Sequence, residues 1–317
     1  MTDWQLNQRA NGIVSTLANQ LDELRIARHE LTGSGTVYDF GVKVPGSLAA
    51  GLKLAEICLS GRGSVSLVPG ELAGIGWPHL QVVSDQPVAA CLFSQYAGWQ
   101  VSVDRFFAMG SGPMRAASGR EAVFQNLSYR ETPSVAVGIL EGRKLPTEAV
   151  FQFLAEKTGV PAQQTVLLIA PTASVSGNLQ VVARVIETAL HKLLELGFDM
   201  TRIESATGTA PLSPVAKDDL NGIGRTNDAI LYGGRVTLWV HGDDESLAEI
   251  GPRVPANASP AHGRPFIKIF ESAGRDFYMI DPHLFSPAEI VFQNLDTGRV
   301  QAFGKVEPDI LKQSFGL

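Results

Sequence analysis

Two charged side chains stand alone in a long uncharged part of the sequence. Between Thr158 and His191 the charged residues are Arg184 and Glu187. The surrounding segment, 179–190, predicts a helix that is apolar on nearly every side, and helices of that kind are buried. Side chains three positions apart lie on one helix face, so the guanidinium and the carboxylate are able to meet. Arg and Glu are almost never fully buried without a partner, which makes this pair the first candidate for chemistry.

Two interpretations of the pair stay open from the residues alone. As a structural pair it would join buried segments, although such pairs often cost as much free energy as they return. At the surface it would stabilise the helix by only about 0.2–0.5 kcal/mol. If the helix face borders a cleft, Glu187 is suited to act as a general base on water. Arg184 would then hold that water or a developing oxyanion.

Metal-dependent and nucleophilic catalysis have weaker support. The six histidines are scattered and form neither an HExxH nor a His-x₃₋₅-His pair, and Cys58 and Cys91 are too far apart for a CxxC knuckle. We therefore expect no metal. The chain has no Gly-x-Ser-x-Gly elbow for a nucleophilic serine. Cys91 lies in the apolar run 89–93, where a packed thiol is expected.

Three glycine-rich segments and one neutral loop let the backbone approach a ligand closely. Segments 110–113, 208–211 and 222–228 lack the spacing of phosphate-binding loops and are expected to be ordinary turns. The loop 172–178 is more informative, because it follows an apolar strand expected at 165–170 and precedes a helix. In α/β proteins, ligands bind in crevices at the carboxyl ends of the strands, and N–H groups at a helix N-terminus favour electronegative atoms. A plain helix cap by Ser176 or Asn178 is equally compatible with the residues.

Hydrophobic periodicity and turn residues predict alternating helices and strands. Helices are expected over the first ~30 residues and over 45–59, 87–96, 146–157 and about 178–197. Strands are expected at 37–42, 64–68, 80–84, 99–103, 134–140, 165–170, 203–206 and 229–240. This alternation indicates an α+β fold of two mixed α/β domains, 1–150 and 151–317.

Composition excludes several classes of protein. Of 317 residues, 44% are hydrophobic and 18% are charged, as in a well-buried globular protein. The net charge of −6 provides no basic field for nucleic acid. No apolar run approaches the ~18 residues of a membrane span, and the N-terminus does not resemble a signal peptide. Two cysteines fit a reducing compartment, so we expect a cytoplasmic protein.

Six segments resemble, in order, the family of methenyltetrahydromethanopterin cyclohydrolases. The longest are Pro-Thr-Ala-Ser-Val-Ser-Gly at 171–177 and Gly-Arg-Thr-Asn-Asp-Ala-Ile-Leu-Tyr-Gly-Gly at 224–234. The others are 95–101, 107–113, 183–188 and 206–211. The likeness extends from about residue 39 to residue 244.

The resemblance implies a hydrolase that acts on a cyclic amidine C–N bond in one-carbon metabolism and formaldehyde oxidation. Its members interconvert the 5,10-methenyl and N5-formyl forms of tetrahydromethanopterin, with water as co-substrate and neither metal nor nucleotide. The pterin, or its dephospho form, is thus the C1-carrying substrate. The resemblance also implies a homotrimer whose subunits have two α/β domains with a pterin pocket between them.

The resemblance assigns roles to individual residues. Its catalytic Arg and Glu fall on Arg184 and Glu187, and the segment that touches the catalytic water or formyl oxygen falls near Ser94, Gln95 and Tyr96. Archaeal members carry Lys at the position of Tyr96, so this chain lacks that cation. The candidate substrate-binding residues are Met109, Gly110, Ser111, Thr172, Ser174, Thr209, Asn227 and Asp228.

Other functions remain open at this point. One is a folate-type methenyl cyclohydrolase on the same scaffold. Another is a non-catalytic pterin-binding subunit of a one-carbon enzyme complex, which would bind substrate without turnover. A third is a structural oligomer subunit that binds no pterin.

Overall fold

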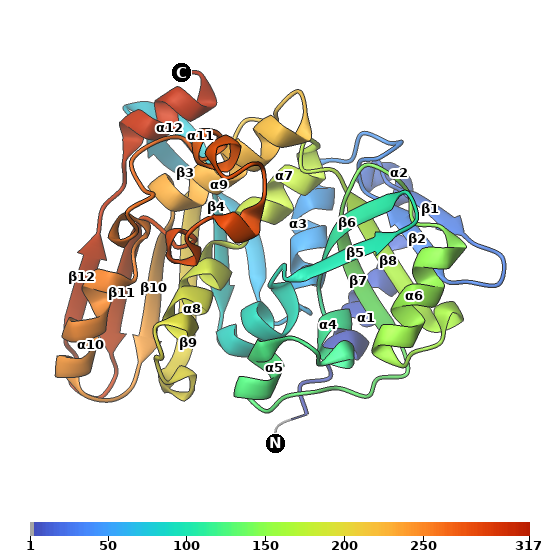
Figure 1. Ribbon diagram of the computed structural model, residues 1–317, viewed down its shortest axis with the longest axis horizontal. Helices are drawn as coiled ribbons and strands as arrows, with labels where there is room; N and C mark the ends of the chain where they lie inside the picture. The colour runs from blue at the N-terminus through green and yellow to red at the C-terminus, as the bar shows by residue number, and fades with distance from the viewer. Residues whose placement is uncertain (1–2) are drawn as a thin grey trace. The chain divides into compact units, whose positions relative to one another are not determined.

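The computed structural model describes residues 3–317, which form two compact units. Unit 1 joins the segment that ends at Gly63 to Ala89–Gln180, and unit 2 joins Ser64–Val88 to Val181–Leu317. Each unit contains one six-stranded mixed sheet (Figure 1). The expected fold class, α+β with two mixed α/β domains, is confirmed. The units differ from the expected division into 1–150 and 151–317 in two places: the hairpin of residues 64–88 joins the second sheet, and residues 151–180 belong to unit 1.

The sheet of unit 1 combines parallel and antiparallel strands. Parallel pairs join β2 to β8 and β8 to β7, and the remaining neighbours are antiparallel. In sheet order the strands are β1 (Ala27–Glu30), β2 (Thr36–Asp39), β8 (Thr165–Ala170), β7 (Ala136–Glu141), β6 (Phe106–Ser111) and β5 (Trp99–Val103). The sequence predicts β5 and β8 to the residue, because each is an apolar or alternating run between turn signals.

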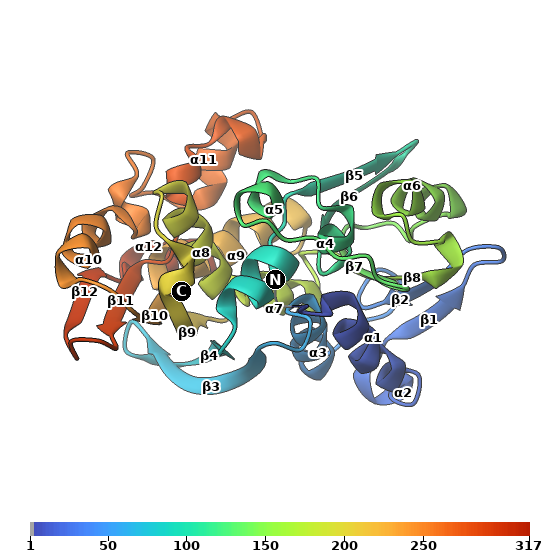
Figure 2. The same ribbon diagram turned by 90° about the horizontal axis from the view of Figure 1, so that it is seen from below.

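Helices cover both faces of this sheet (Figure 2). On one face α1 (Leu6–Leu17) and α3 (Leu48–Cys58) pack against residues such as Ile139 and Leu168. On the other face α4 (Met114–Ser118) and α6 (Glu148–Thr158) lie with Leu140, Leu167 and Ile169. Adjacent strand residues alternate between the two cores, as the two-residue period of a strand requires. The unit also contains α2 (Leu21–Leu24) and α5 (Ala122–Asn126).

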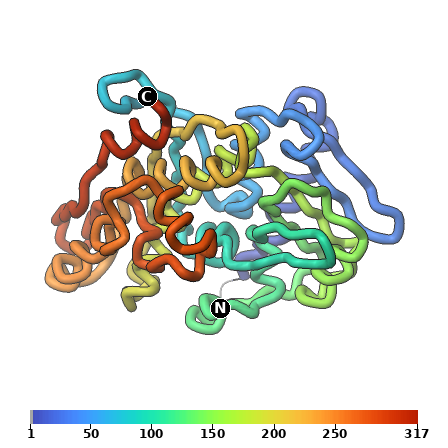
Figure 3. Tube along the Cα trace, turned by 45° about the horizontal axis from the view of Figure 1, so that its top comes forward, coloured from blue at the N-terminus to red at the C-terminus, as the bar shows by residue number. Residues whose placement is uncertain are grey.

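The sheet of unit 2 is antiparallel except for one parallel pair, β10 with β11. In order the strands are β12 (Val300–Gly304), β11 (Glu289–Asn294), β10 (Arg235–Val240), β9 (Ile203–Pro211), β4 (Ile75–Ser84) and β3 (Ser64–Leu72). The β3–β4 hairpin, cyan in Figure 3, lies beside the C-terminal helix. Trp77 of the hairpin stacks on Phe315 with ring centroids 6.0 Å apart.

Two long helices pack on the sheet of unit 2, and others pack around them. Strand β9 contacts both α8 (Val185–Glu195) and α9 (Asp219–Gly233). Helix α9 in turn contacts α11 (Phe266–Ser272) and α12 (Pro308–Phe315). The remaining helix is α10 (Asp244–Ile250). Across residues 3–317, no helix is both long and apolar enough to span a membrane.

Some sequence-based expectations about secondary structure are wrong. The helix expected over the first 30 residues ends earlier, since residues 27–30 are strand β1. The glycine-rich segment 222–228, expected to be a turn, lies inside α9, so the strand expected at 229–240 begins only at Arg235. Helix α9 forms because Asp218 caps it, accepting from Asn221 N at 2.9 Å. Its Gly224 allows α11 to approach: a Cβ there would lie 3.1 Å from Ile267 Cβ.

The single helix expected up to residue 197 is two helices. α7 (Val175–Val182) ends before Ala183, and α8 begins at Val185. Each helix packs closely on a different glycine: a Cβ on Gly51 would lie 2.9 Å from Leu179 Cβ, and a Cβ on Gly208 would lie 2.8 Å from Ile186 Cγ1. The two contacts belong to different units. Neither contact requires one straight helix, and the chain turns between α7 and α8.

Replacing Gly208 by Ala is expected to destabilise the protein. A Cβ there would also lie 2.8 Å from Val185 Cγ1, so α8 has to shift away from β9. Overpacking of this kind costs about 1–3 kcal/mol. Gly76→Ala, in β4 of the same sheet, is the matched control, because a Cβ added there would have no atom within 4 Å. Thermal unfolding should show a lower Tm for Gly208→Ala alone; equal Tm values for both variants would contradict the close packing.

Candidate functional site

Arg184 and Glu187 lie at the start of α8, in unit 2. Arg184 is the N-cap residue, with φ −80° and ψ 6°, and Glu187 is the third residue of the helix. Both side chains are only 5% exposed. The chain turn at Ala183 therefore corrects the expectation that both residues belong to one continuous helix. The burial of both charges, which the sequence predicted from their apolar surroundings, is confirmed.

The position of Glu187 has an electrostatic consequence. The first turn of a helix presents N–H groups without intrahelical partners and carries a partial positive charge. A carboxylate there is stabilised in its charged form. The backbone continues regularly from this point, since Thr188 N donates to Arg184 O at 2.9 Å. A carboxylate held in one place at the start of a helix is suited to accept a proton from a bound water.

Ser94 and Gln95 close a π-helix in unit 1, η1 (Val88–Gln95), where the sequence predicted an ordinary helix. The wider turn is visible in the bond from Tyr96 N to Cys91 O, five residues back, at 2.8 Å. π-Helical turns are rare and occur frequently at functional sites. Nothing in the hydrophobic pattern of 87–96 distinguishes a π-helix from an α-helix, so the sequence could not indicate it.

Ser94, Gln95 and Ser111 gather around Cys58, the last residue of α3. Ser94 Oγ donates to Cys58 O at 2.6 Å, and Ser111 Oγ lies 3.5 Å from Cys58 Sγ. Gln95 O lies 4.0 Å from the same sulfur. All four residues are fully buried. The structure thus brings together three of the predicted site residues, at the carboxyl end of a helix that the sequence analysis did not connect with them.

Two further buried polar side chains belong to this cluster and were not predicted. Ser60 Oγ lies 2.7 Å from Ser94 Oγ, and Gln180 Nε2 donates to Cys58 Sγ at 3.5 Å. Ser60 and Gln180 are fully buried. Their positions depend on contacts between segments far apart in the chain, and no local motif marks them.

Arg115 is a third residue that was missed, although the sequence carries a signal for it. It is the one charged residue in the segment 106–119, just as Arg184 and Glu187 are isolated among apolar residues. Arg115 is fully buried in α4. The criterion that found Arg184 would have found Arg115 as well.

The loop before α7 has the geometry of a helix cap. Ser174 Oγ accepts from Gly177 N at 3.1 Å and donates to Pro171 O at 2.7 Å. Thr172 and Ser174 are buried at the carboxyl end of β8. Ser174, rather than Ser176 or Asn178, is the capping residue here.

Met109, Gly110 and Ser111 lie in β6, which ends at Ser111. Of the turn expected at 110–113, the first two residues therefore belong to the strand.

The remaining candidates lie in unit 2. Thr209 is within β9, where the sequence predicted a turn over 208–211. Asn227 Nδ2 donates to Ile223 O at 2.9 Å, within α9. Asp228 joins three helices: its carboxylate accepts from Phe266 N at 2.7 Å and from Ser314 Oγ at 2.6 Å. These contacts give Asp228 a structural role whatever else it does.

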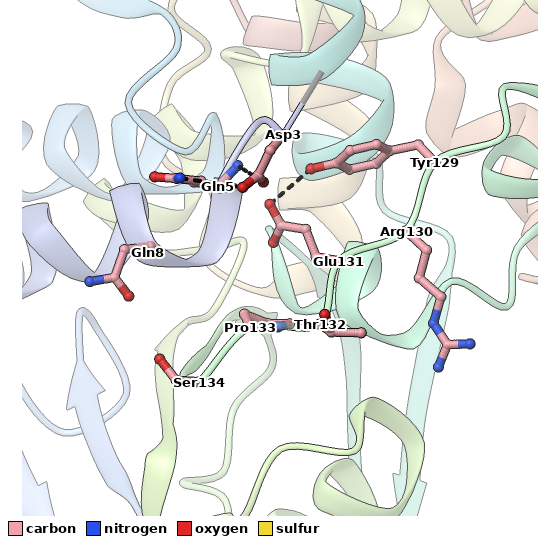
Figure 4. Close-up of a pocket in the computed structure, with 9 residues that line it drawn as sticks. All are labelled: Asp3, Gln5, Gln8, Tyr129, Arg130, Glu131, Thr132, Pro133 and Ser134. Carbon is pink, nitrogen blue, oxygen red and sulfur yellow. Dashed lines mark hydrogen bonds between the residues drawn. The ribbon is translucent and has the colours of Figure 1, made fainter. Parts of the chain in front are cut away.

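A surface pocket lies in unit 1 apart from these residues (Figure 4). Its volume is about 350 Å³. Glu131, a buried lining residue, accepts from Tyr129 Oη at 2.9 Å. It also accepts from Asn7 Nδ2 at 2.7 Å, so its carboxylate is paired within the protein. The pocket is lined by Asp3, Gln5, Gln8, Tyr129, Arg130, Glu131, Thr132, Pro133 and Ser134. None of these is a predicted site residue.

Within residues 3–317, no three His, Cys, Asp or Glu side chains lie in an arrangement that could hold a metal ion. The candidate residues carry mostly hydroxyl, amide, thiol and backbone groups, and the candidates with a guanidinium or carboxyl group are Arg184, Glu187 and Asp228. Groups of this kind pair with the edges of a polar heterocycle.

Comparison with known proteins shows similarity over the full length of the chain. The family model described as cyclohydrolase (MCH) matches residues 5–315. A protein of Methylobacillus flagellatus is 42% identical over 100% of this chain and 97% of its own length. A Rhodopirellula baltica protein is 47% identical over 89% and 86%, and one of Methanospirillum hungatei is 39% identical over 98% of each chain. All three bear the name methenyltetrahydromethanopterin cyclohydrolase.

The buried carboxyl of Asp228 predicts a pH dependence of stability. Burial raises its pKa from 3.8 to about 7. Between these values the folded state keeps a proton that the unfolded state releases, so the free energy of unfolding falls as pH rises through this range. The contribution of this group is up to about 4 kcal/mol.

Asp228→Asn should remove that contribution, because the amide is neutral at every pH. Urea unfolding of wild type and variant across this range should therefore give curves of stability against pH that diverge. Asp309→Asn, whose side chain is 93% exposed, serves as the control and should follow the wild type. Parallel curves for wild type and Asp228→Asn would contradict the assignment.

Proposed function

The chain belongs to the cyclohydrolase (MCH) family, and on that premise we propose that it catalyses the reversible hydrolysis of 5,10-methenyltetrahydromethanopterin to the N5-formyl form. The observation that carries the proposal is the match over residues 5–315, with relatives of that name 39–47% identical. The burial of Arg184 and Glu187 at one helix start supports it independently.

The substrate needs little activation. Its methenyl carbon lies in a delocalised N–C–N cation and is already electrophilic, so the enzyme has to position a water and accept its proton. In the proposed reaction the water oxygen bonds to that carbon while Glu187 takes one proton. The resulting carbinol breaks its C–N10 bond, N10 takes the proton back from Glu187, and the hydroxyl proton leaves to solvent as the formyl C=O forms. The net release is one proton for each water consumed.

Arg184 has a separate task in this scheme. A guanidinium offers five N–H donors in a fixed plane. It is suited to orient the attacking water and to stabilise the oxygen as negative charge develops on it. Its position at the N-cap, three residues before Glu187, keeps it at the same end of α8.

Ser94, Gln95 and Tyr96 are proposed to contact the water or the formyl oxygen. The Gln95 amide and the Tyr96 hydroxyl are able to donate to that oxygen without changing their own charge, whereas Ser94 Oγ, which donates to Cys58 O, is left to accept from the water. The neutral segments that contain Met109, Gly110, Ser111, Thr172, Ser174, Thr209, Asn227 and Asp228 are proposed to bind the pterin. Backbone N–H and C=O groups there match the amide and amine edge of the ring.

We extend the proposal to the assembly and the cofactor requirement. The protein is proposed to act as a cytoplasmic homotrimer, with the pterin or its dephospho form as substrate and without metal. Sedimentation of the purified protein tests the trimer, and dialysis against a chelator tests the metal. Retained turnover after dialysis supports the metal-free mechanism.

Glu187→Gln is expected to retain the fold and substrate binding but to lose about 10²–10⁴-fold in kcat, since an amide cannot accept the proton. Hydration is followed by the loss of methenyl absorbance, with methenyltetrahydromethanopterin and methenyltetrahydrofolate compared in parallel. Glu195→Gln, at the other end of α8 and 49% exposed, is the matched control and should turn over normally.

Three results would contradict this function. Normal turnover by Glu187→Gln would remove Glu187 from the mechanism. Faster hydration of the folate would assign a folate-type enzyme. Tight pterin binding by wild type without turnover would indicate a binding subunit.

Arg184→Ala is expected to lower both kcat and Tm. The lower rate follows from the loss of the group that orients water, and the lower Tm follows from the loss of a buried cation beside buried polar groups. Steady-state kinetics and thermal unfolding of the same preparation separate the two effects. A fall in Tm with unchanged kcat would support a purely structural pair.

A further inference from the structure

Arg115 is a fully buried cation in unit 1 that the proposed chemistry does not use. Burying a guanidinium is costly unless its charge is compensated and its N–H groups are paired. The residues that satisfy Arg115 therefore show which part of the structure depends on it.

One side of the guanidinium binds a carboxylate. Arg115 Nε donates to Glu121 Oε1 at 2.8 Å, and Nη2 donates to Glu121 Oε2 at 2.6 Å. This is the two-pronged arrangement that fixes a guanidinium plane most strongly. The Glu121 side chain is 22% exposed, so it anchors the buried cation from the edge of the unit.

The other side of the guanidinium binds the end of the π-helix η1. Arg115 Nη1 donates to Leu92 O at 3.1 Å and to Ser94 O at 3.2 Å. The last carbonyls of a helix have no partner within it and carry partial negative charge, so a cation there is favourable. Ser94 O also accepts from Gly112 N at 2.9 Å. Arg115 thus caps η1 from a different helix.

The same guanidinium also orients Tyr96. Its central carbon lies 4.8 Å from the centre of the Tyr96 ring and 5.3 Å from that of Phe124. A cation at these distances is attracted to the ring faces. Gly98 leaves room for this arrangement, since a Cβ there would lie 2.5 Å from Tyr96 Cε1 and 2.7 Å from Glu121 Oε2.

We propose that Arg115 is the positioning residue for the segment Ser94–Gln95–Tyr96. It holds the backbone at Leu92 and Ser94 and the ring of Tyr96, so that the side chains of this segment keep one geometry during hydration. The role rests on the proposed function, in which these three residues contact the water or formyl oxygen. Arg115 itself is not assigned a catalytic role, because its Nε, Nη1 and Nη2 atoms all donate to protein acceptors.

The primary test is Arg115→Lys, which keeps the charge but not the planar fork. One ammonium cannot replace the paired bonds to Glu121 and also reach both carbonyls. Misplacement of a contact residue by about 1 Å is expected to lower kcat about 10²-fold. KM should change little, because the proposed pterin-binding segments are left intact.

Arg202→Lys is the matched control. Arg202 also lies over a ring, 4.9 Å from the centre of Phe198, and also donates to backbone carbonyls, those of His241 and Asp243. None of these partners is a predicted site residue. Its replacement should lower Tm without a change in kcat, which separates positioning from general destabilisation.

A double-mutant cycle with Gln95→Ala supplies the decisive readout. If Arg115 acts by placing this segment, replacing it in a chain that already lacks the Gln95 amide should lower kcat much less than in the wild type. Independent, multiplying losses would overturn the proposal. So would a fall in Tm for Arg115→Lys with normal kcat.

A second variant and a prior measurement keep the test conclusive. If Arg115→Lys does not fold, Glu121→Gln weakens the same anchor at a partly exposed site, and the same loss of kcat and coupling to Gln95 are expected. Wild-type turnover is measured first. Its absence would overturn the proposed function and this role together, whereas turnover without coupling would overturn the role of Arg115 alone.

Discussion

A buried guanidinium needs a nearby negative charge and an acceptor for its N–H groups, and in unit 1 this requirement organises the candidate site. Arg115 meets it through Glu121 on one side and the carbonyls of Leu92 and Ser94 on the other. The bonds that satisfy the cation also fix the end of a π-helix. An apolar residue in its place would fill space but would leave those carbonyls without their donor.

Unit 2 uses a different constraint to place its charges. The start of α8 lies against β9 and β10. Gly208 of β9 and Gly234, the residue before β10, leave room for Val185. Close packing between a helix and two strands sets the helix position within a few tenths of an ångström, because interiors are as dense as crystals. Glu187 lies in the first turn of this helix, so its backbone position is fixed equally closely. Each unit therefore holds its polar groups in place: unit 1 does so through hydrogen bonds, and unit 2 does so through close packing.

Patterns in the sequence predicted the features that depend on neighbouring residues alone. The strands at 99–103 and 165–170 and the burial of Arg184 and Glu187 follow from periodicity and from isolated charges. The glycine-rich part of α9 was misjudged, because its glycines serve contact with α11 rather than a turn. The π-helix, the turn at Ala183 and the transfer of the β3–β4 hairpin to the second sheet depend on partners remote in sequence. No single-segment pattern contains that information.

Amide hydrogen exchange of the wild-type protein tests most directly whether the end of η1 is held rigidly. The relevant amides are Tyr96 N, bonded to Cys91 O, and Gly112 N, bonded to Ser94 O. A segment fixed by a buried cation should open only with the unit as a whole, so both amides should exchange as slowly as those of β7 and β8. Rapid exchange of Tyr96 and Gly112 while β7 and β8 stay protected would contradict the account.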